Sequence, residues 1–296
     1  MDARQFFERF FEPVDVIDRG FLTGYYEPEL AGSLTPEGGF RTPLLGRPAG
    51  FVGKGSGPTP PGWPPGMTAA RRTASGLQAF PDRAAIEGGA LGEAARPIVY
   101  LADPVDAFMV HIQGSARVRL GDGRLLRVGF DGRNGHPYTP VARVLADQEG
   151  TPRAEMTADR LVAWLKAHPD RAPAVMQANR SYIFFRATEV ASEAGPIGAA
   201  GVPLTTGRSL AVDPSHASYG TPIWLDGSIP APGGATEPLR RLVVAQDTGA
   251  AITGRGRGDL FFGSGAEAGA RASLVRHPVR WVVLRPKRPD RPGPRP

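Results

Sequence analysis

One stretch near the C-terminus carries two candidate acids between strand-forming residues: Val243-Val244-Ala245-Gln246-Asp247-Thr248-Gly249-Ala250-Ala251-Ile252-Thr253-Gly254-Arg255-Gly256-Arg257-Gly258-Asp259-Leu260-Phe261-Phe262. Its β-branched start predicts a strand that delivers Asp247. A glycine-rich loop then turns the chain, and Asp259 follows directly before an apolar run. Upstream, Asp213 comes after another short apolar run. Carboxylates at strand ends beside flexible loops are well placed for acid/base chemistry on a polymer that must fit into a groove.

Each of these aspartates also has a structural interpretation. An aspartate beside glycine or proline commonly forms a turn, because its side chain bonds to its own backbone and tolerates unusual φ and ψ angles. Three such residues in the last third of the chain favour a site, but the local pattern by itself leaves both interpretations open.

Composition limits the fold and the partners. With 296 residues, 41% of them hydrophobic, the chain can form a real core in one large domain or two. Its 39 glycines and 31 prolines favour short strands and turns over a helix bundle. The formal charge of +6 suits nucleic acid or an anionic polymer such as the bacterial wall. Because no motif interleaves aromatic and basic residues, we expect no nucleic-acid partner.

Several site classes are missing from the sequence. The chain has no cysteine, which excludes disulfides, thiolate metal sites, a cysteine nucleophile and a lipobox cysteine in the sequence given. Its five histidines form neither an i, i+4 pair nor a His-Glu-x-x-His motif, so we expect no metal and no cofactor. The first residues lack the features of a signal peptide. No stretch approaches the ~20 apolar residues of a membrane span.

Hydrophobic periodicity predicts a mostly β protein with a few helices. Helices are expected at residues 3–12, where Pro13 ends the helix, at 139–149, and at 157–167 with Thr157 as the N-cap. Strands are expected at residues 98–102, 209–212, 222–225, 239–245 and 279–284, with a hairpin at 116–130 around Gly121-Asp122-Gly123. Residues 48–68 are rich in proline and glycine and predict an irregular loop or an extended segment. Residues 263–269 predict a loop and helix start, and residues 286–296 a disordered tail.

The three aspartates also carry a family resemblance. Asp213, Asp247 and Asp259, in the settings Ala-Val-Asp-Pro, Ala-Gln-Asp-Thr-Gly and Arg-Gly-Asp-Leu-Phe, resemble the three-aspartate (3D) domain of the membrane-bound lytic transglycosylase A (MltA) family. Further motifs resemble the same family: Leu22-Thr23-Gly24-Tyr25-Tyr26-Glu27-Pro28, Val110-His111-Ile112-Gln113-Gly114-Ser115, Gly132-Arg133-Asn134-Gly135-His136-Pro137-Tyr138, and Asn179-Arg180-Ser181-Tyr182-Ile183-Phe184-Phe185 followed by Gly201-Val202-Pro203-Leu204. In family order, these motifs cover roughly residues 20 to 285.

The resemblance implies a two-domain architecture. A double-psi β-barrel would form from residues 1–26 plus 190–285, with a second β-rich MltA domain inserted at residues 27–189. We expect the ends of the insertion to lie close together, because insertions are tolerated where chain ends meet.

The resemblance also implies a lytic murein transglycosylase that cleaves the β-1,4 bond between N-acetylmuramic acid and N-acetylglucosamine and leaves a 1,6-anhydro ring. Asp259 would act as general acid and then base, since an apolar flank raises the pKa of a carboxyl group. Asp247 would support it, and Asp213 would be structural or lie behind the site. Thr253 departs from the pattern, because relatives often have lysine there. The expected partners are peptidoglycan glycan strands, with other cell-wall enzymes as further candidates, in the periplasm or outer membrane of a Gram-negative bacterium.

The candidate glycan-binding residues provide stacking faces, amides and hydroxyls. They are Thr23, Tyr25, Tyr26, Gln113, Gly114, Ser115, Asn134 and Tyr138. The tyrosines suit a core or a turn equally well. Two other functions stay open: a polysaccharide hydrolase that uses Asp247 and Asp259 as an inverting pair, and a non-catalytic peptidoglycan-binding module. Reducing product ends would indicate hydrolysis, anhydro ends would indicate the lytic reaction, and binding without fragment release would indicate the module.

Overall fold

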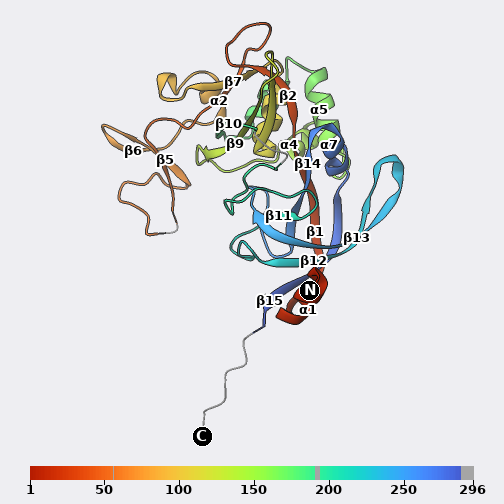
Figure 1. The fold of residues 1–296 in the computed structure, drawn as a ribbon. Coiled ribbons are helices and arrows are strands. Elements are labelled where there is room, and N and C mark those ends of the chain that lie inside the picture. The colour runs from red at the N-terminus through yellow and green to blue at the C-terminus, as the bar shows by residue number, and fades with distance from the viewer. Residues whose placement is uncertain (56, 191–193, 288–296) are drawn as a thin grey trace. The chain divides into compact units, whose positions relative to one another are not determined.

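The computed structural model describes residues 1–55, 57–190 and 194–287, and it forms two compact units (Figure 1). The first unit contains Met1–Tyr25, Ile197–Gly263 and the chain from Ala270 onward. The second contains Tyr26–Pro196 and the short segment Ser264–Gly269. Strands dominate both, which confirms the expected fold class of a barrel domain with a second, inserted β-rich domain. The domain boundaries expected at 26/27 and 189/190 stay a prediction.

A closed barrel of six strands builds the first unit, in the order β1-β14-β11-β13-β12-β15. The strands are β1 (Phe11–Glu27), β11 (Ser209–Val212), β12 (Pro222–Pro230), β13 (Thr236–Asp247), β14 (Arg257–Ser264) and β15 (Arg276–Pro286). Strand β11 runs parallel to β13 and antiparallel to β14, while β1 and β15 pair antiparallel. The barrel therefore closes only when the first strand of the chain meets the last one, side by side in Figure 1.

The barrel core comes from the inward-facing residues of these strands. Leu210, Ile223, Leu225, Leu260 and Trp281 are buried together. Such alternation of buried and outward-facing residues is what a strand with one face on the core produces. The tight packing constrains the backbone as well: a Cβ added to Gly258 would lie 2.7 Å from the Trp281 ring. Glycine at this position lets β14 pass directly over the indole.

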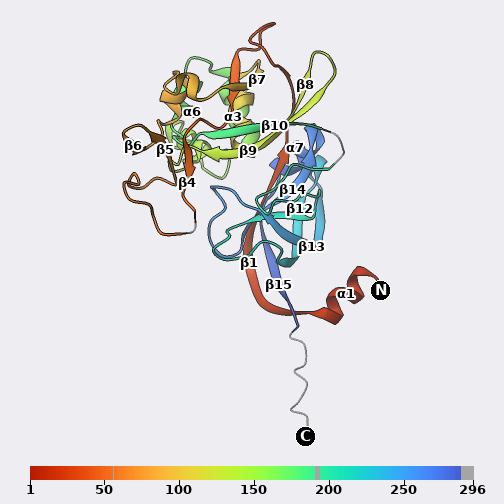
Figure 2. The same ribbon diagram turned by 60° about the vertical axis from the view of Figure 1, so that its left-hand side comes forward.

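The helical segments of the first unit are short. They are α1 (Ala3–Phe10), the 3-10 turn η2 (Pro232–Gly234) and α7 (Gly265–Ser273), whose first residues belong to the second unit. Asp2 caps α1 by accepting a hydrogen bond from the Gln5 amide at 2.8 Å. No residue of α1 is buried, and Figure 2 shows this helix projecting from the barrel.

The second unit contains a six-stranded sheet in the order β10-β9-β8-β2-β7-β3 and a three-stranded sheet in the order β4-β5-β6. Its strands are β2 (Glu29–Ser33), β3 (Thr42–Leu45), β4 (Phe51–Gly53), β5 (Ala69–Thr73), β6 (Gly76–Gln78), β7 (Pro97–Leu101), β8 (Ser115–Leu120), β9 (Leu125–Arg133) and β10 (Ile183–Glu189). Its helices are α2 (Arg83–Glu87), η1 (Gly92–Ala94), α3 (Pro104–Gln113), α4 (Val141–Gln148), α5 (Ala158–Ala167) and α6 (Ala172–Gln177). No helix in the described part of the chain is long and apolar enough to cross a membrane.

Helix α3 joins the sheet to the other helices, because it contacts β3, β7 and β8 on one side and α5 on the other. Ala107 and Val110 pack into the sheet core, and Phe108 packs with α4, α5 and α6. Asp103 caps the helix through the Val105 amide at 2.7 Å. Gly114 ends it with a φ of 84°, the left-handed conformation that glycine adopts without strain.

Several expected elements are confirmed. Helices α4 and α5 lie where they were expected, and the Thr157 hydroxyl accepts from the Arg160 amide at 3.2 Å as the predicted cap. Strands β8 and β9 form the predicted hairpin, with Ser115 paired to Gly129. The expected strands at 98–102, 209–212, 222–225, 239–245 and 279–284 correspond to β7, β11, β12, β13 and β15.

Other expectations were wrong at particular places. Helix α1 ends at Phe10, and Pro13 lies inside β1, whose ladder with β15 has a register shift there. Residues 257–258 belong to β14, although they were expected in a flexible loop. Helix α3 was not expected at all. In the predicted tail, Pro286 ends β15 and the Lys287 amide donates to the Phe10 carbonyl at 2.7 Å, while residues 288–296 lie outside the described residues.

A buried ion cluster surrounds Glu27 in the second unit. This carboxylate is fully buried and accepts from Arg127 Nε at 2.6 Å and from Arg117 Nε at 3.0 Å. The Ser264 hydroxyl donates to it at 2.7 Å. Arg127 also donates to the Ala194 carbonyl at 2.7 Å. Glu27 and Arg127 together thus link the end of β1, the strands β8 and β9, and two later segments of the chain.

We expect Glu27→Gln to lower the free energy of unfolding by about 3–5 kcal/mol, because it leaves two nearly buried guanidinium groups without their counter-charge. Urea denaturation followed by circular dichroism measures the change. The matched control is Glu29→Gln, which removes the more exposed pair with Arg119 and should cost about 1 kcal/mol or less. Equal losses for the two variants would contradict this assignment.

Candidate active site

Asp259 lies in the wall of the barrel, on β14 between β1 and β11. Its Cα partner on β11 is Ala211. From β1, the Thr23 hydroxyl donates to Asp259 Oδ1 at 2.6 Å. No hydrogen bond to Oδ2 comes from any of the described residues, so Thr23 fixes one oxygen and leaves the other for a proton.

The surroundings of Asp259 raise its pKa to about 6. Burial is the largest cause, because removing the carboxylate from water penalises its charged form. The Thr23 hydrogen bond and the nearby positive charge of Arg257 both lower the pKa, and the negative charge of Asp247 raises it. The direction agrees with that expected from the apolar flank. This carboxyl group can therefore still carry a proton in weakly acidic solution.

Asp247 is held differently, at the end of β13. The Tyr25 hydroxyl donates to its Oδ2 at 2.8 Å, and the Ala199 amide donates to its Oδ1 at 3.0 Å. Burial raises the pKa of Asp247, and these two hydrogen bonds oppose that rise. Burial and the adjacent negative charge of Asp247 raise the pKa of the Tyr25 hydroxyl well above its ordinary value, so it stays a donor. Both oxygens of Asp247 are thus occupied and its orientation is fixed.

The strand register brings the two acids to one place. Ala211 on β11 is the Cα partner of Asp247 on one side and of Asp259 on the other. Since neighbouring strands lie about 4.8 Å apart, the two aspartates are about 10 Å apart at Cα, with their side chains on the same face. Ala211 places only a methyl group between them.

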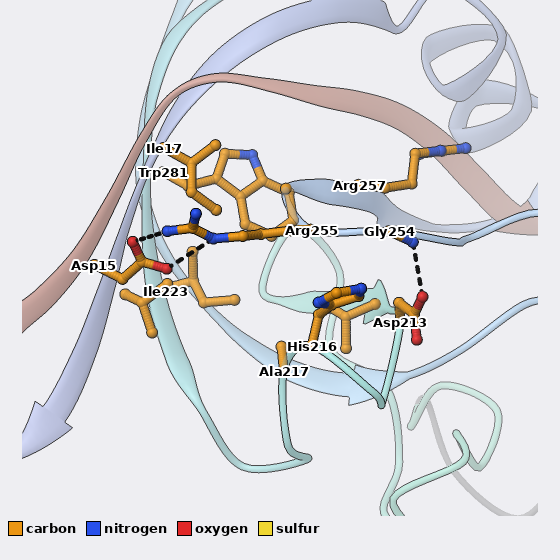
Figure 3. Close-up of a pocket in the computed structure, with 13 residues that line it drawn as sticks. Asp15, Ile17, Asp213, His216, Ala217, Ile223, Gly254, Arg255, Arg257 and Trp281 are labelled. Atoms are coloured by element: carbon orange, nitrogen blue, oxygen red, sulfur yellow. Dashed lines mark hydrogen bonds and ion pairs between the residues drawn. The ribbon is translucent and has the colours of Figure 1, made fainter.

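Asp213 holds the loop that precedes β14 (Figure 3). It accepts from the Gly254 amide at 2.7 Å, from the Ser215 amide at 2.9 Å and from the Ser215 hydroxyl at 2.6 Å. These hydrogen bonds, that from Gly254 first, lower the pKa of Asp213 to about 2, so it stays ionised. Arg255 in the same loop forms an ion pair with Asp15. The cavity beside them, of about 30 Å³, admits water and not a sugar.

The second unit contains another group of the predicted residues. Gln113 Oε1 accepts from the Tyr26 amide at 3.2 Å. The Tyr26 ring packs on α7, where a Cβ added to Gly269 would lie 2.8 Å from it. Gly114 ends helix α3, and the buried Ser115 begins β8. Tyr25 belongs to the first unit and Tyr26 to the second, so a single peptide bond separates the acid-binding tyrosine from this group.

The surroundings of Asn134 do not fit a direct glycan contact. Its side chain is fully buried, and its Nδ2 group donates to the Pro81 and Arg180 carbonyls at 3.0 and 2.9 Å. Its Oδ1 accepts from the Tyr182 amide at 2.9 Å and from the His136 amide at 3.4 Å. The amide therefore has no group left for a sugar, and it holds three loops together instead. Tyr138 nearby is partly exposed.

Sequence reasoning missed two contributors to the acid site. The Ala199 amide binds Asp247, and no sequence pattern distinguishes a backbone donor of this kind. Arg257 puts a positive charge near Asp259. The two residues are two positions apart on β14, so a strand prediction there would have placed both side chains on one face. Among the described residues, no three His, Asp or Glu side chains are grouped to hold a metal ion.

Comparison with known proteins links both units to one family. Residues 21–186 match the MltA-specific insert domain, and residues 208–285 match the 3D domain. Membrane-bound lytic murein transglycosylase A of Escherichia coli K12 is 29% identical over 268 residues, which cover 88% of this chain and 65% of the relative. The chain thus spans slightly less than two thirds of the length of that relative.

Solved structures of the same family are similar to this chain over most of its length. A membrane-bound lytic murein transglycosylase from Agrobacterium tumefaciens is 38% identical with a TM-score of 0.84, covering 96% of this chain and 78% of its own. MltA from Neisseria gonorrhoeae, in a monoclinic crystal form, is 31% identical with a TM-score of 0.74, and the match covers 97% of this chain and 81% of that one. E. coli MltA with bound chitohexaose is 26% identical with a TM-score of 0.76, and the match covers 97% of this chain and 79% of that one. These matches confirm the resemblance: the chain belongs to the MltA family and carries both the MltA insert domain and the 3D domain.

Proposed function

We propose that this chain is a lytic murein transglycosylase that cleaves the β-1,4 bond between N-acetylmuramic acid and N-acetylglucosamine. The observation that carries the proposal is Asp259, a desolvated carboxyl group with one unoccupied oxygen on the barrel of this family. The lytic murein transglycosylases among its relatives and the chitohexaose bound to one of them support a glycan substrate. In this proposal, the barrel domain, residues 1–26 plus 190–285, is catalytic, and the protein works in the cell envelope.

The proposed reaction needs a single acid. Asp259 donates its proton to the leaving glycosidic oxygen as the bond to the anomeric carbon breaks. The resulting Asp259 carboxylate then takes the proton of the sugar's C6 hydroxyl, whose oxygen bonds to the anomeric carbon and closes the 1,6-anhydro ring. Asp259 ends the cycle protonated, and no water is consumed. The first step leaves the group deprotonated, which is what the second step requires.

Asp247 supports this chemistry through its charge. An oxocarbenium-like transition state is stabilised by a nearby negative charge in a site of low dielectric constant. With the Tyr25 hydroxyl and the Ala199 amide on its two oxygens, Asp247 is poorly placed to activate a water as a base. This favours the lytic reaction over an inverting hydrolase, which needs a second carboxylate for that purpose.

The remaining candidates divide by their contacts. Thr23 and Tyr25 bind the two acids, so we assign them to positioning. Tyr26, Gln113 and Tyr138 are assigned to glycan binding, with Gly114 and Ser115 shaping the backbone beside Gln113. Asp213 holds the loop before β14.

Asp259→Asn should reduce the rate of anhydro-muropeptide release from purified murein by ~100-fold or more, because an amide cannot deliver the proton. Asp247→Asn should reduce the rate less, and Asp213→Asn should act mainly through stability. Mass spectrometry of the products measures the rate and also separates anhydro ends from reducing ends. The assignment fails if Asp259→Asn works at a near-parental rate, or if Asp247→Asn is the more harmful change.

The free energy of unfolding of Asp259→Asn is the control for its fold, and the direction of its change follows from the pKa of Asp259. The raised pKa of Asp259 means that its charged form opposes folding above about pH 6. Replacing it at pH 7 should therefore leave the free energy of unfolding unchanged or raise it, by up to about 3 kcal/mol for a shift from 3.8 to about 6. An inactive and unfolded variant would point to a structural role for Asp259.

The same pKa sets the pH dependence of the parent enzyme. Only the protonated form of Asp259 can begin the reaction, so kcat/KM should fall as pH rises through about 6. Initial rates on murein between pH 4.5 and 8 measure the profile. A rate that increases through this range would mean that the essential group acts first as a base.

Gln113→Ala should weaken glycan binding by about threefold to tenfold, the usual effect of one lost hydrogen bond. Binding to chitohexaose by calorimetry measures it, and Gln148→Ala, which changes an exposed glutamine at the end of α4, is the matched control. Parental affinity in a folded Gln113→Ala variant would remove Gln113 from the glycan site.

A further inference from the structure

The second unit contains a cavity of about 500 Å³ apart from the residues assigned above. Its walls are apolar and include Ile86, Leu91, Phe108 and Met176. The volume falls within the roughly 300–1,000 Å³ of ordinary small-molecule sites, which combine apolar walls with a few polar groups. Gln113, Tyr26 and the three aspartates do not line it.

A buried cation lies in the lining of this cavity. The Arg83 side chain is 1% exposed. It donates from Nε to the Asn179 carbonyl at 3.0 Å, from one terminal nitrogen to the Ser181 carbonyl at 2.7 Å, and from the other to Glu87 at 3.2 Å. A guanidinium group has five N–H donors, so two remain without a hydrogen-bond partner among the described residues.

Two further donors line the same cavity, His111 Nε2 and the Tyr182 hydroxyl. His111 Nδ1 is occupied, because it accepts a hydrogen bond from the Ile183 amide at 3.3 Å. Burial and the charge of Arg83 lower the pKa of His111 well below its ordinary value, so the ring is neutral with its proton on Nε2. Tyr182 is also buried, and burial raises its pKa, so its hydroxyl keeps its proton. Within the described part of the chain, neither Nε2 nor this hydroxyl has a hydrogen-bond partner.

The charges of the lining favour an anion. Arg41 and Arg83 are positive, and Glu87 is the one negative lining residue in the described chain. Both oxygens of Glu87 are engaged, one by Arg83 and one by Gln177 Nε2 at 3.0 Å. The lining therefore combines one excess positive charge, several unused donors and apolar walls. A carboxylate flanked by small apolar groups complements all three features.

We propose that this cavity binds the carboxylate end of a short peptide, with Arg83, His111 and Tyr182 as donors and the apolar walls around its side chains. The choice of a peptide rests on the proposed function, because peptidoglycan carries short peptides with free carboxylates and alanine methyl groups. Such a peptide is either a stem still attached to the glycan strand or one released during wall turnover. The two sources share the same chemistry at the cavity.

The direct test is binding of N-acetyl-D-alanyl-D-alanine to the full chain, measured by calorimetry, with its C-terminal amide as the uncharged comparison. The acid should bind at least tenfold more tightly than the amide, as expected for losing charge-assisted hydrogen bonds. Tyr182→Phe removes one donor and keeps the ring, and it should weaken binding of the acid by about threefold to tenfold. Arg41→Glu reverses a charge at the exposed rim and should weaken it further, whereas Arg143→Glu on α4 should not.

A second measurement distinguishes the two sources. Arg41→Glu should slow cleavage of peptide-bearing murein but not of glycan strands stripped of their peptides if the cavity takes attached stems. If Arg41→Glu cleaves each polymer at the same rate as the parent chain but binds the dipeptide more weakly, the cavity takes released peptides.

The proposal is overturned if the parent chain does not bind the dipeptide at millimolar concentration, if acid and amide bind alike, or if Tyr182→Phe and Arg41→Glu bind like the parent. Binding is measured without turnover, so these outcomes are independent of the proposed activity. The proposed activity fails separately, if the parent chain releases no anhydro products from either polymer.

Discussion

The register at Ala211 is the constraint on which the acid site depends. Strand β11 has only four residues, yet it pairs with β13 on one side and β14 on the other, and this brings Asp247 and Asp259 to the same level of the barrel. The ladder with β13 has a register shift between Leu210 and Ala211, so Asp247 rather than Gln246 lies opposite Ala211. A further slip of one residue in either ladder would turn an acid to the opposite face, because side chains alternate along a strand. The buried Leu210 and Val212 fix the register, since a slip would also remove them from the core.

The three aspartates have different properties. Asp213 and Asp247 come at the ends of β11 and β13, whereas Asp259 lies between a glycine-rich segment and an apolar run. The pKa is about 2 for Asp213 and about 6 for Asp259. The difference arises from the partners. Asp213 accepts three hydrogen bonds and is exposed to water, whereas Asp259 accepts one and is largely desolvated. Hydrogen bonds to the charged form lower the pKa of a carboxyl, and burial raises it.

Local patterns predicted a mostly β protein, the hairpin of β8 and β9, and helices α4 and α5, through alternation, a two-glycine turn and a capping threonine. The barrel with an inserted domain was implied only by the family resemblance, and the local pattern of the three aspartates left a site and simple turns both open. Strand β14 was partly missed, because its residues 257–258 continue a glycine-rich run that is typical of a loop. Their strand conformation comes from pairing with β11 and from the close approach of Gly258 to Trp281, and neither is visible along the chain.

The roles of single residues also depend on tertiary contacts that are not visible along the chain. Asn134 has the right chemistry for a sugar ligand, but its donors and its acceptor are used by backbone groups of residues 81, 136, 180 and 182. Whether an amide faces a ligand or the backbone is decided by tertiary packing, so its presence in a motif does not distinguish the two. The boundary between Tyr25 and Tyr26 illustrates the point within one dipeptide: one hydroxyl binds Asp247, and the other ring packs on Gly269.

Helix α3 shows how one motif can serve two places. His111 and Gln113 are two residues apart, and two residues turn an α-helix by about 200°, so the two side chains leave it in nearly opposite directions. Gln113 binds the Tyr26 amide, while His111 lines the cavity that contains Arg83. The left-handed Gly114 then ends the helix and Ser115 begins β8, which fixes the position of both side chains relative to the sheet. A change in the cap would therefore affect both places together, whereas His111 and Gln113 can be altered one at a time.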